Sequence, residues 1–325
     1  MRTNPKVSIV MPIFQAEPFI LHCLQTLMAQ TDTDFEIVAV DDCSSDRSKE
    51  IAEEFLSSQS TIPWKIIQSE TNVGPAECRQ IAISHSRGEY ILCVDSDDFV
   101  APNVIEVACN EAESSGADVV VFGGKCVDTN GQQLYEVASG DSTMSGMDAI
   151  AKIFDLSLQG YCWNKLFRRD LFSSVEHPRG LIYEDILVCV QAFAGARVVR
   201  LIPDQLYFYV KRTNSLSVRF NPRIVDLFEI VDRVERCTRL LPIANYEALL
   251  FRLRYVFAFR TMAFEAARQA PNYDLAAPIL KRVSSSLQYG DIRKMYADNR
   301  PKLSVAMFLL KVDPRIFFRF VRRFK

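Results

Sequence analysis

The first part of the chain alternates between short apolar runs and segments in which apolar residues recur at helical spacing. Val7–Ile13 is nearly continuous in apolar character, as expected for a strand that is buried on both faces. Glu17–Gln30 follows it with a helical period. Four later runs repeat the strand pattern, with helical segments between them: Phe35–Val40, Trp64–Gln68, Glu89–Val94 and Ala117–Gly123. This order predicts an α/β fold, Rossmann-like, with a mostly parallel central sheet and helices on both faces.

The pattern changes after about residue 128, where a polar stretch predicts a loop or a hairpin. A short helix near Met147–Asp155 and a second helix in YEDILVCVQAFAGA follow, and then RVVRLIP and QLYFYV predict two further strands. From about Pro222 the chain has helical patterns throughout. We therefore expect a catalytic domain over residues 1–220, with halves at about 1–128 and 129–220, and a helical C-terminal region over residues 221–325.

Composition excludes several classes of protein. A formal net charge of -2 over 325 residues argues against nucleic acid as a partner, because that partner requires a basic face. The nine cysteines include no CxxC pair, which favours reduced thiols in a cytoplasmic protein over a disulfide framework or a zinc site. No stretch of about 18 apolar residues occurs, so we expect no membrane-spanning helix.

Acidic residues follow strand patterns at two places and open a helical pattern at a third. The three groups are Asp41–Asp42, Asp95–Asp98 and Glu184–Asp185. An open α/β sheet binds ligands at the carboxyl ends of its strands, so these loops are predicted to lie near one site. Several carboxylates at one site repel one another unless a cation is present, which indicates a bound metal ion.

The segment Asp95–Asp98 is the best candidate for that ion. If it is extended, Asp95 and Asp97 point the same way and can face one ligand. Two carboxylates suit Mg²⁺ or Mn²⁺, ions that keep substrate phosphates among their ligands. The alternative is a solvated turn and helix cap, because a single DxD is common.

Four segments occur in an order that resembles a known family: VSIVMPIFQAEPFI, EIVAVDDCSSDRS, NVGPAECRQIAISHSRGEYILCVDSDD and GLIYEDI. Together they resemble the inverting glycosyltransferases of family 2, which have the GT-A fold. The resemblance covers roughly residues 6–217. It implies transfer of a sugar, hexosyl or N-acetylhexosaminyl, from a nucleotide-diphospho-sugar with the help of Mn²⁺ or Mg²⁺. UDP is the expected nucleotide only because the family commonly uses it, and the implied acceptor is a glycan or a lipid-linked glycan.

The resemblance assigns the donor side of the site position by position. Asp41 corresponds to the residue that hydrogen-bonds the nucleotide base, and Asp97 is implied as the more direct metal ligand, with Asp95 beside it. Arg79 is implied to approach the nucleotide or the acidic cluster, with an exposed helical arginine as the alternative. The other residues implied to contact the donor are Pro12, Phe14, Glu17, Asn72, Ser96 and Asp98.

The resemblance also assigns the acceptor side. Asp185 corresponds to the general base that deprotonates the acceptor hydroxyl, with Glu184 beside it. The alternative is that both are acids favoured in the first turn of a helix by its dipole. Trp163 either stacks on a sugar or is a buried core residue. Lys165, Lys211 and Arg212 are implied near the acceptor and the diphosphate, in a segment that runs on to Ser215. Some relatives have a metal-binding histidine there, but the only histidines here are His22, His85 and His177.

The C-terminal tail Asp313–Lys325 mixes phenylalanines with arginines. A basic, aromatic-rich helix of this kind can lie on an anionic membrane surface, which predicts a peripheral location on the inner face of the cell membrane. The alternatives are a helix docked on its own domain and a contact between copies in a homo-oligomer.

Rival functions remain at this point. A phosphohydrolase with a nucleophilic DxD has that motif after its first strand, whereas here it follows the fourth, and the GxGxxG of a dinucleotide enzyme is absent after the first strand. The stronger rival is a non-catalytic sugar-nucleotide-binding or scaffold protein that has kept the GT-A fold. Retention of Asp95, Asp97 and Asp185 argues against it.

Overall fold

A computed structural model describes residues 4–212 and 219–323 of the chain. The described residues form two compact units. Unit 1 comprises the residues up to Ile150 together with Gly160–Lys211, and it contains the sheet. Unit 2 comprises Ala151–Gln159 and the residues from Arg212 onward, and it is helical.

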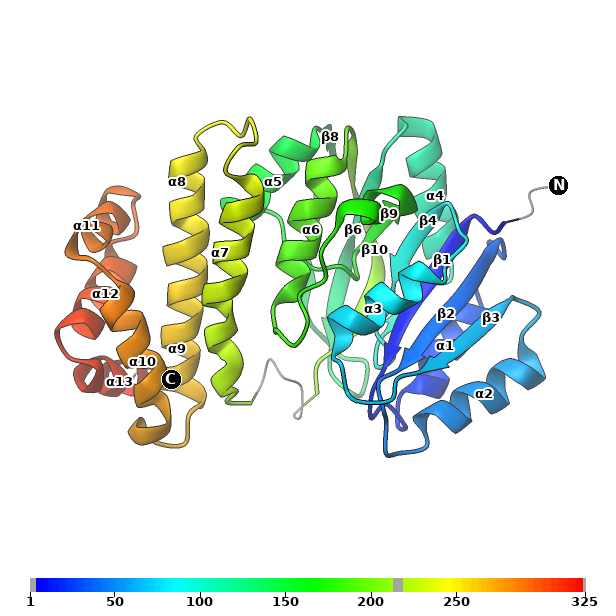
Figure 1. Cartoon of the computed structure of the whole chain (residues 1–325), viewed down its shortest axis with the longest axis horizontal. Helices are drawn as coiled ribbons and strands as arrows, with labels where there is room; N and C mark the ends of the chain where they lie inside the picture. The colour runs from blue at the N-terminus through cyan, green and yellow to red at the C-terminus, as the bar shows by residue number, and fades with distance from the viewer. Residues whose placement is uncertain (1–3, 213–218, 324–325) are drawn as a thin grey trace. The chain divides into compact units, whose positions relative to one another are not determined.

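Unit 1 is built on one mixed sheet, whose main path has the strand order β3-β2-β1-β4-β9-β6-β10-β5 (Figure 1). Its strands are β1 (Val7–Ile13), β2 (Phe35–Asp41), β3 (Trp64–Gln68), β4 (Tyr90–Cys93), β5 (Phe99–Val100), β6 (Val119–Val127), β7 (Gln133–Val137), β8 (Ser142–Met144), β9 (Lys165–Arg168) and β10 (Val199–Val210). Strands β3, β2, β1 and β4 pair in parallel, and so do β6 and β10. The predicted α/β class and mostly parallel core are therefore confirmed.

Strand β9 was not predicted, and two predicted strands form a single strand. Lys165–Arg168 forms β9, which enters between β4 and β6 and pairs with both in the antiparallel sense. The two strands expected in RVVRLIP and QLYFYV are one strand, β10. Its pairing with β6 shifts register between Leu201 and Tyr207, a bulge that bends the strand without ending it.

Helices cover both faces of this sheet. Figure 1 shows α3 (Pro75–Ser84) and α6 (Glu184–Gly195) on the face turned toward the viewer. On β1, alternate residues from Val7 to Ile13 face a core that also contains buried residues of α1 (Ile20–Met28), α2 (Ser48–Gln59) and α4 (Val104–Ser115). Both faces of the strand are buried, which explains its nearly continuous apolar sequence.

Unit 2 consists of helices that pack on one another. Its helical segments are η2 (Pro222–Val225), α7 (Asp226–Thr238), α8 (Tyr246–Phe251), η3 (Arg252–Phe259), α9 (Arg260–Gln269), α10 (Tyr273–Ser286), α11 (Tyr289–Ala297), α12 (Pro301–Val312) and α13 (Pro314–Arg323). Helix α8 is continued by α9, with the π-helical turn η3 between them, so the helical patterns expected from about Pro222 are present here. Helix α5 (Gly146–Phe154) lies where the predicted short helix was placed.

The described part of the C-terminal tail, which ends at Arg323, packs against its own unit; residues 324–325 lie outside the described residues. Phe317, Phe318 and Val321 of α13 are buried, and the Phe317 ring meets Phe264 of α9 edge to face at 5.4 Å. Arg322 donates hydrogen bonds to backbone carbonyls just beyond α9. The docked helix, one of the alternatives that the sequence left open, is the arrangement present in this unit.

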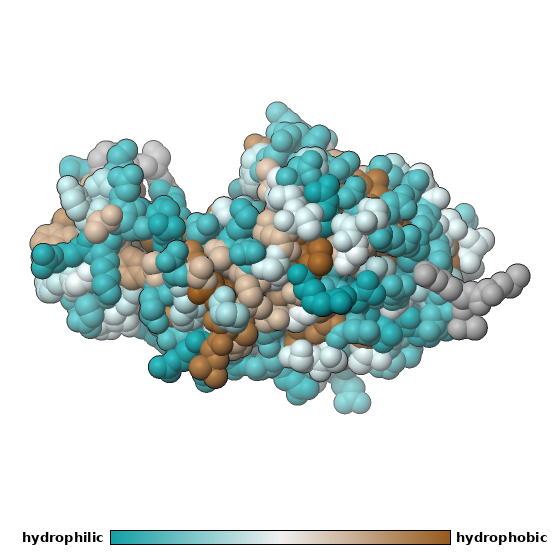
Figure 2. All heavy atoms as spheres, turned by 90° about the horizontal axis from the view of Figure 1, so that it is seen from above, coloured by the Kyte–Doolittle hydropathy of each residue, from teal (hydrophilic) through white to brown (hydrophobic). Residues whose placement is uncertain are grey.

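Among the helices of residues 4–212 and 219–323, none has both the length and the apolar character needed to cross a bilayer. The face seen in Figure 2 is mainly hydrophilic, with hydrophobic residues gathered in small patches. All nine cysteines are unbridged thiols, and most are buried.

Candidate active site

The loops that carry the acidic residues meet at one edge of the sheet. Because β1, β2 and β4 are parallel, their carboxyl ends lie together, and Ile13 at the end of β1 pairs with Asp41 at the end of β2. The backbone N–H of Asp42 donates to the Ile13 carbonyl at 2.8 Å. This is the edge at which open α/β sheets bind ligands.

Asp41 presents an unused acceptor at this edge. The residue is 1% exposed, and its Oδ2 accepts a hydrogen bond from the backbone of Ser44 at 3.2 Å. Its Oδ1 is buried and has no hydrogen-bond partner among residues 4–212 and 219–323. A buried acceptor without a donor is unfavourable, so this oxygen is suited to a ligand N–H.

Asp42 holds the turn that leads into α3. Its two carboxylate oxygens accept the backbone N–H groups of Val73 and Gly74 at 2.6 and 2.9 Å. Gly74 has φ +87, a conformation that other residues rarely adopt, and Asn72 Nδ2 donates to the Asp42 carbonyl at 3.4 Å. The segment Asn72–Gly74 therefore shapes this loop. A direct contact of Asn72 with substrate stays a prediction.

The loop after β1 is tied to the loop after β2. Glu17 Oε2 accepts the backbone N–H of Arg47 at 3.0 Å, and Ser48 Oγ accepts the backbone N–H of Ala16 at 2.7 Å. Phe14 projects from the braced loop with half of its surface exposed. Pro12 precedes it as a partly buried residue of β1. Glu17 thus stabilises the loop that presents Phe14, and its predicted contact with the donor stays a prediction.

Arg79 joins the turn after β4 to the first turn of α6. It comes from α3 and is only 6% exposed. Its Nη2 donates to Asp95 Oδ1 at 2.8 Å, while its Nη1 donates to Asp185 Oδ1 at 2.8 Å and to Glu184 Oε1 at 3.1 Å. The sequence-based alternative of an exposed helical arginine is wrong. A buried guanidinium is tolerated here because three carboxylates surround it.

The same cluster shifts the pKa values of its members. Burial disfavours the charged form of Arg79, but the carboxylates of Asp185 and Asp95 outweigh it and raise the guanidinium pKa. Burial, reinforced by the negative charge of Asp185, raises the pKa of Glu184 to about 7, and Arg79 acts in the opposite direction. Glu184 and Asp185 occupy the first turn of α6, whose dipole favours acids.

The Asp95–Asp98 segment forms a turn, contrary to the extended conformation assumed above. The Asp98 N–H donates to the Asp95 carbonyl at 3.1 Å and closes the turn. Both Asp98 carboxylate oxygens are engaged by β10, one by the Tyr207 hydroxyl at 2.9 Å and the other by the Val210 N–H at 2.7 Å. Asp98 therefore anchors the turn to the sheet, and any contact with the sugar would have to share these oxygens. Ser96 within the turn is buried.

Tyr207 is a site residue that sequence reasoning missed. Its hydroxyl donates to Asp98 and accepts the backbone N–H of Asp95 at 3.1 Å, so one buried side chain fixes both ends of the turn. The sequence showed it only as one aromatic among several in a strand pattern. Its distance from Asp95 along the chain hid the contact.

The carboxylates present fit a hexacoordinate divalent ion that draws most of its ligands from substrate and water. Asp97 is partly exposed in the turn, and Asp95 lies two residues before it with Oδ1 held by Arg79. Within the described residues no group of three or more His, Cys, Asp or Glu side chains is placed to hold a metal. Mg²⁺ and Mn²⁺ need only one or two protein carboxylates when phosphates are also ligands.

Trp163 and Lys165, both predicted to contact substrate, lie beneath the surface. Trp163 is 6% exposed and stacks between Tyr161 and Tyr207, with ring centroids at 5.2 and 4.6 Å. Lys165 is fully buried, and its ammonium donates to the Tyr161 carbonyl at 2.6 Å and to Asn164 Oδ1 at 2.7 Å. For Trp163 the buried core alternative is confirmed. Lys165 holds the backbone beside the site, and its predicted contact with substrate stays a prediction.

The basic residues after β10 are only partly described. Lys211 is exposed at the end of the strand, where its N–H donates to the Val127 carbonyl at 2.8 Å, and Arg212 is the last residue before the gap. Thr213–Ser215, which completed the predicted diphosphate loop, lie outside the described residues. The role of Lys211 and Arg212 stays a prediction.

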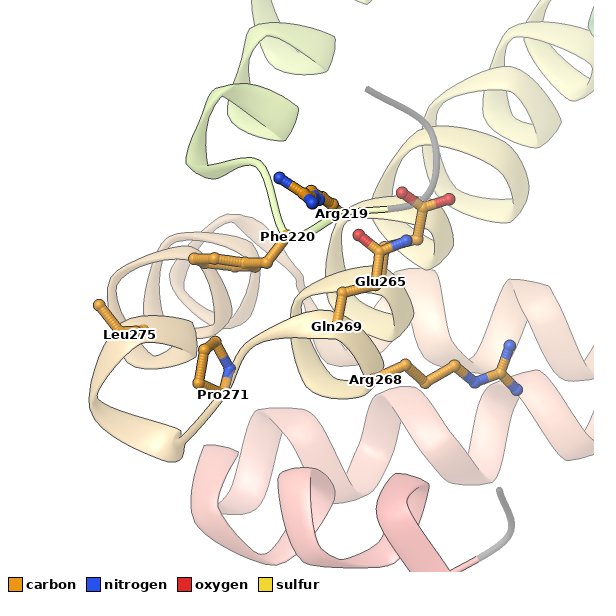
Figure 3. A pocket seen from close by; sticks show the side chains of 7 residues that line it. All are labelled: Arg219, Phe220, Glu265, Arg268, Gln269, Pro271 and Leu275. Atoms are coloured by element: carbon orange, nitrogen blue, oxygen red, sulfur yellow. The ribbon is translucent and has the colours of Figure 1, made fainter. Parts of the chain in front are cut away.

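Unit 2 contains an open pocket of a different character. It has a volume of about 810 Å³. Figure 3 shows apolar side chains near the start of α10 and polar side chains along α9; the lining residues are Arg219, Phe220, Glu265, Arg268, Gln269, Pro271 and Leu275. Its lining includes one carboxylate and two guanidinium groups, whereas three carboxylates meet around Arg79 in unit 1. The acidic edge of the sheet is therefore the candidate active site.

Comparisons with known proteins agree with this geometry. The sequence profile described as Glycosyl transferase family 2 matches residues 8–175, just over half of the chain. Glycosyltransferase GlyG of Streptococcus pneumoniae is 26% identical over 264 residues, which cover 77% of this chain and 85% of GlyG. The uncharacterized glycosyltransferase EpsJ of Bacillus subtilis is 32% identical over 66% of this chain, which spans 63% of the length of EpsJ.

Solved structures show the same fold. The crystal structure of Staphylococcus aureus TarS, residues 1–349, in complex with UDP-GlcNAc superposes with a TM-score of 0.72 at 22% identity, covering 98% of this chain and 91% of that one. A mannosyltransferase from Pyrobaculum calidifontis, solved with GDP-Man and Mn²⁺, gives a TM-score of 0.57 at 13% identity. These likenesses confirm the GT-A fold. With the profile match and the site geometry, they place the chain in glycosyl transferase family 2, and it is a glycosyltransferase.

Proposed function

We propose that this glycosyltransferase moves a hexosyl or N-acetylhexosaminyl group from a nucleotide-diphospho-sugar to an acceptor hydroxyl, with inversion at the anomeric carbon. The observation that carries the proposal is the Arg79 cluster. One buried guanidinium joins Asp95, on the donor side, to Asp185, the candidate base. Such a link fixes the base relative to the donor, and positioning of this kind supplies much of the rate in group transfer.

The donor in this proposal is a UDP-sugar. The buried Asp41 Oδ1 lacks a donor in the part of the chain that the structure describes, and the imide N–H of uracil is a group that it can accept. The exposed Phe14 lies on the loop braced against the loop that follows Asp41. The TarS structure of the same fold was solved with UDP-GlcNAc. These three observations support a uridine nucleotide at this edge of the sheet.

The metal in this proposal is Mn²⁺ or Mg²⁺, with Asp97 as the more direct ligand and Asp95 beside it. When bound, such an ion neutralises the charge that develops on the departing nucleoside diphosphate. The protein needs to supply only one or two ligands, because phosphate oxygens and water complete the coordination shell. The Mn²⁺-bearing mannosyltransferase of the same fold supports this choice.

Asp185 is the base in this proposal. Its Oδ1 is held by Arg79 at 2.8 Å, while the contact of its Oδ2 with the backbone N–H of Cys162, a described neighbour, is long at 3.3 Å. Oδ2 is therefore the oxygen that takes the proton of the acceptor hydroxyl. The acceptor oxygen then attacks the anomeric carbon from the face opposite the leaving group, which gives inversion.

Replacement of Asp97 by Ala tests the donor and metal assignment. We expect Asp97→Ala to remove the Mn²⁺-dependent part of UDP binding, which calorimetry with and without Mn²⁺ measures. Asp274→Ala, at an exposed acid of α10 in unit 2, is the matched control and should bind as the parent does. Unchanged Mn²⁺-dependent binding in Asp97→Ala would contradict the assignment. Donor binding with neither transfer nor donor hydrolysis would favour the non-catalytic alternative.

We also propose that unit 2 docks on an anionic membrane, where a glycan or lipid-linked acceptor would be reached. Exposed apolar residues recur every three or four positions along α12 and α13, with exposed Lys302, Arg315, Arg319 and Arg323 among them. Apolar side chains flanked by cations suit an anionic lipid surface. We call these apolar residues the outer stripe: Val305, Phe308, Val312, Ile316 and Phe320.

Vesicle flotation tests the outer stripe. We expect Phe308→Ser combined with Val312→Ser and Ile316→Ser to abolish flotation with vesicles of phosphatidylglycerol and phosphatidylcholine. Leu240→Ser changes the most exposed leucine of unit 2 outside the stripe and should leave flotation unchanged. Flotation of the triple variant equal to the parent contradicts membrane docking. So does a parent that ignores vesicles but forms dimers lost in the variant, which would assign the stripe to a second copy.

A further inference from the structure

A row of tyrosines lies across the sheet face beside the candidate base. Tyr135 on β7 and Tyr209 on β10 are both in register with Cys126 of β6, one on each side of it. Residues in register on neighbouring strands point to the same face of a sheet. Tyr135 is 48% exposed, and Tyr209 is partly buried. The row therefore presents aromatic surface to solvent at its β7 end.

Tyr161 extends this surface to the base. The residue is 41% exposed and its ring stacks on Trp163, which in turn stacks on the buried Tyr207. Trp163 also lies parallel to Tyr209, with an interplanar angle of 11° and centroids at 6.3 Å. The next residue after Tyr161 donates its N–H to Asp185 Oδ2. An exposed ring thus sits one residue from the backbone group that touches the base.

The sheet beneath these rings is shaped to hold them. Gly124, two residues before Cys126 on β6, makes room for Trp163, because a Cβ at that position would lie 2.7 Å from Trp163 Cζ3. Lys165 Nζ donates to the Tyr161 carbonyl at 2.6 Å and fixes the backbone that carries the ring. Tyr161 is therefore an aromatic surface that is held in place before any ligand binds, and pre-organisation of this kind lowers the cost of binding.

We infer that Tyr161, backed by Trp163, with Tyr135 farther along the row, is the acceptor subsite, and that it takes the pyranose rings of a saccharide. The C–H face of a pyranose packs on an aromatic ring while its hydroxyls remain available for hydrogen bonds. A sugar on Tyr161 would place a hydroxyl near Asp185 Oδ2, and a second sugar residue would meet Tyr135. The inference rests on the proposed function, and it narrows the acceptor to a glycan of at least two residues.

Substitution of Tyr161 tests the subsite with defined sugars. The probes are methyl β-glucoside, methyl β-galactoside, methyl β-N-acetylglucosaminide, cellobiose, lactose and chitobiose, each offered as acceptor with UDP-sugar and Mn²⁺. We expect Tyr161→Ala to raise the acceptor KM about five- to tenfold, the loss of one stacked ring, and Tyr161→Phe to stay within about twofold of the parent. Tyr161→Leu, which keeps an apolar cover on Trp163, should resemble Tyr161→Ala.

The remaining readouts separate this inference from the proposed function. Hydrolysis of the UDP-sugar without acceptor, and the donor KM, should be unchanged in every Tyr161 variant. Tyr135→Ala should weaken the disaccharides and not the monosaccharides, and Tyr296→Ala, an exposed tyrosine of α11, should change nothing. An unchanged acceptor KM in Tyr161→Ala overturns the inference. So does a parent that hydrolyses the donor but accepts none of the sugar probes. A parent with no donor hydrolysis and no transfer would instead refute the proposed function.

Discussion

Asp185→Asn is expected to lower the rate of sugar transfer by about 10²- to 10⁴-fold, the range that a general base contributes, while donor binding stays within about twofold of the parent. The amide keeps the size of the carboxylate, and its oxygen can still accept the Arg79 hydrogen bond that Asp185 Oδ1 accepts at 2.8 Å. It cannot take a proton from the acceptor hydroxyl. The loss should therefore appear in kcat for transfer and not in the affinity for UDP-sugar.

A matched acid elsewhere in unit 1 gives the control. Asp170 is exposed at the start of the short η1 helix (Arg169–Ser174), so Asp170→Asn should transfer sugar at the parent rate. Transfer is measured with saturating donor and calorimetry gives the donor affinity. Full turnover by Asp185→Asn would remove Asp185 from the role of base. Glu184 and Asp185 would then only be acids favoured in the first turn of α6.

Arg79→Ala is expected to destabilise unit 1 by about 3 to 5 kcal/mol, the usual cost of removing one partner from a buried ion pair. Three carboxylates, those of Asp95, Glu184 and Asp185, lose their shared cation and repel one another. The urea midpoint at constant m-value measures the change. Arg197→Ala removes an exposed guanidinium that pairs with Asp118 at 3.5 Å, and it should cost less than about 1 kcal/mol.

The stability that Arg79→Ala loses should depend on pH, which gives a second test of the Arg79 cluster. Burial raises the pKa of Glu184 from 4.5 to about 7, so the folded protein holds a proton there that the unfolded chain releases. This group therefore favours folding below about pH 4.5, and its contribution is lost as pH rises through 7. Without Arg79 the free energy of unfolding should fall more steeply as pH rises. The difference in this free energy between Arg79→Ala and the parent should therefore shrink in acid. A gap independent of pH would contradict the electrostatic origin of the effect.

Local sequence patterns correctly predicted the α/β class of the fold and its alternation of strands and helices. The continuous apolar run of β1, the alternation of strands with helices and the acids at strand ends all depend on residues a few positions apart, and their spacing is visible in the chain. Strand β9 was not predicted because it has four residues and begins and ends with a basic one, and its two antiparallel neighbours make it a strand. The two expected strands of β10 merged because a bulge interrupts the alternation without ending the pairing.

The same difference between local patterns and long-range contacts applies to the site residues. The order of residues along the chain shows which side chains carry charge and that two of the acidic groups follow strands, and it therefore predicts the sheet edge where they lie. Which of these side chains are buried, and which partners they meet, depends on the folded arrangement of distant segments. Arg79 meets Glu184 across 105 residues of chain, and Tyr207 meets Asp98 across 109. Burial of a charge depends on partners brought from distant elements, and no local pattern encodes those partners. For the same reason Trp163 and Lys165 resembled ligand contacts in the sequence, and the fold places them beneath Tyr161.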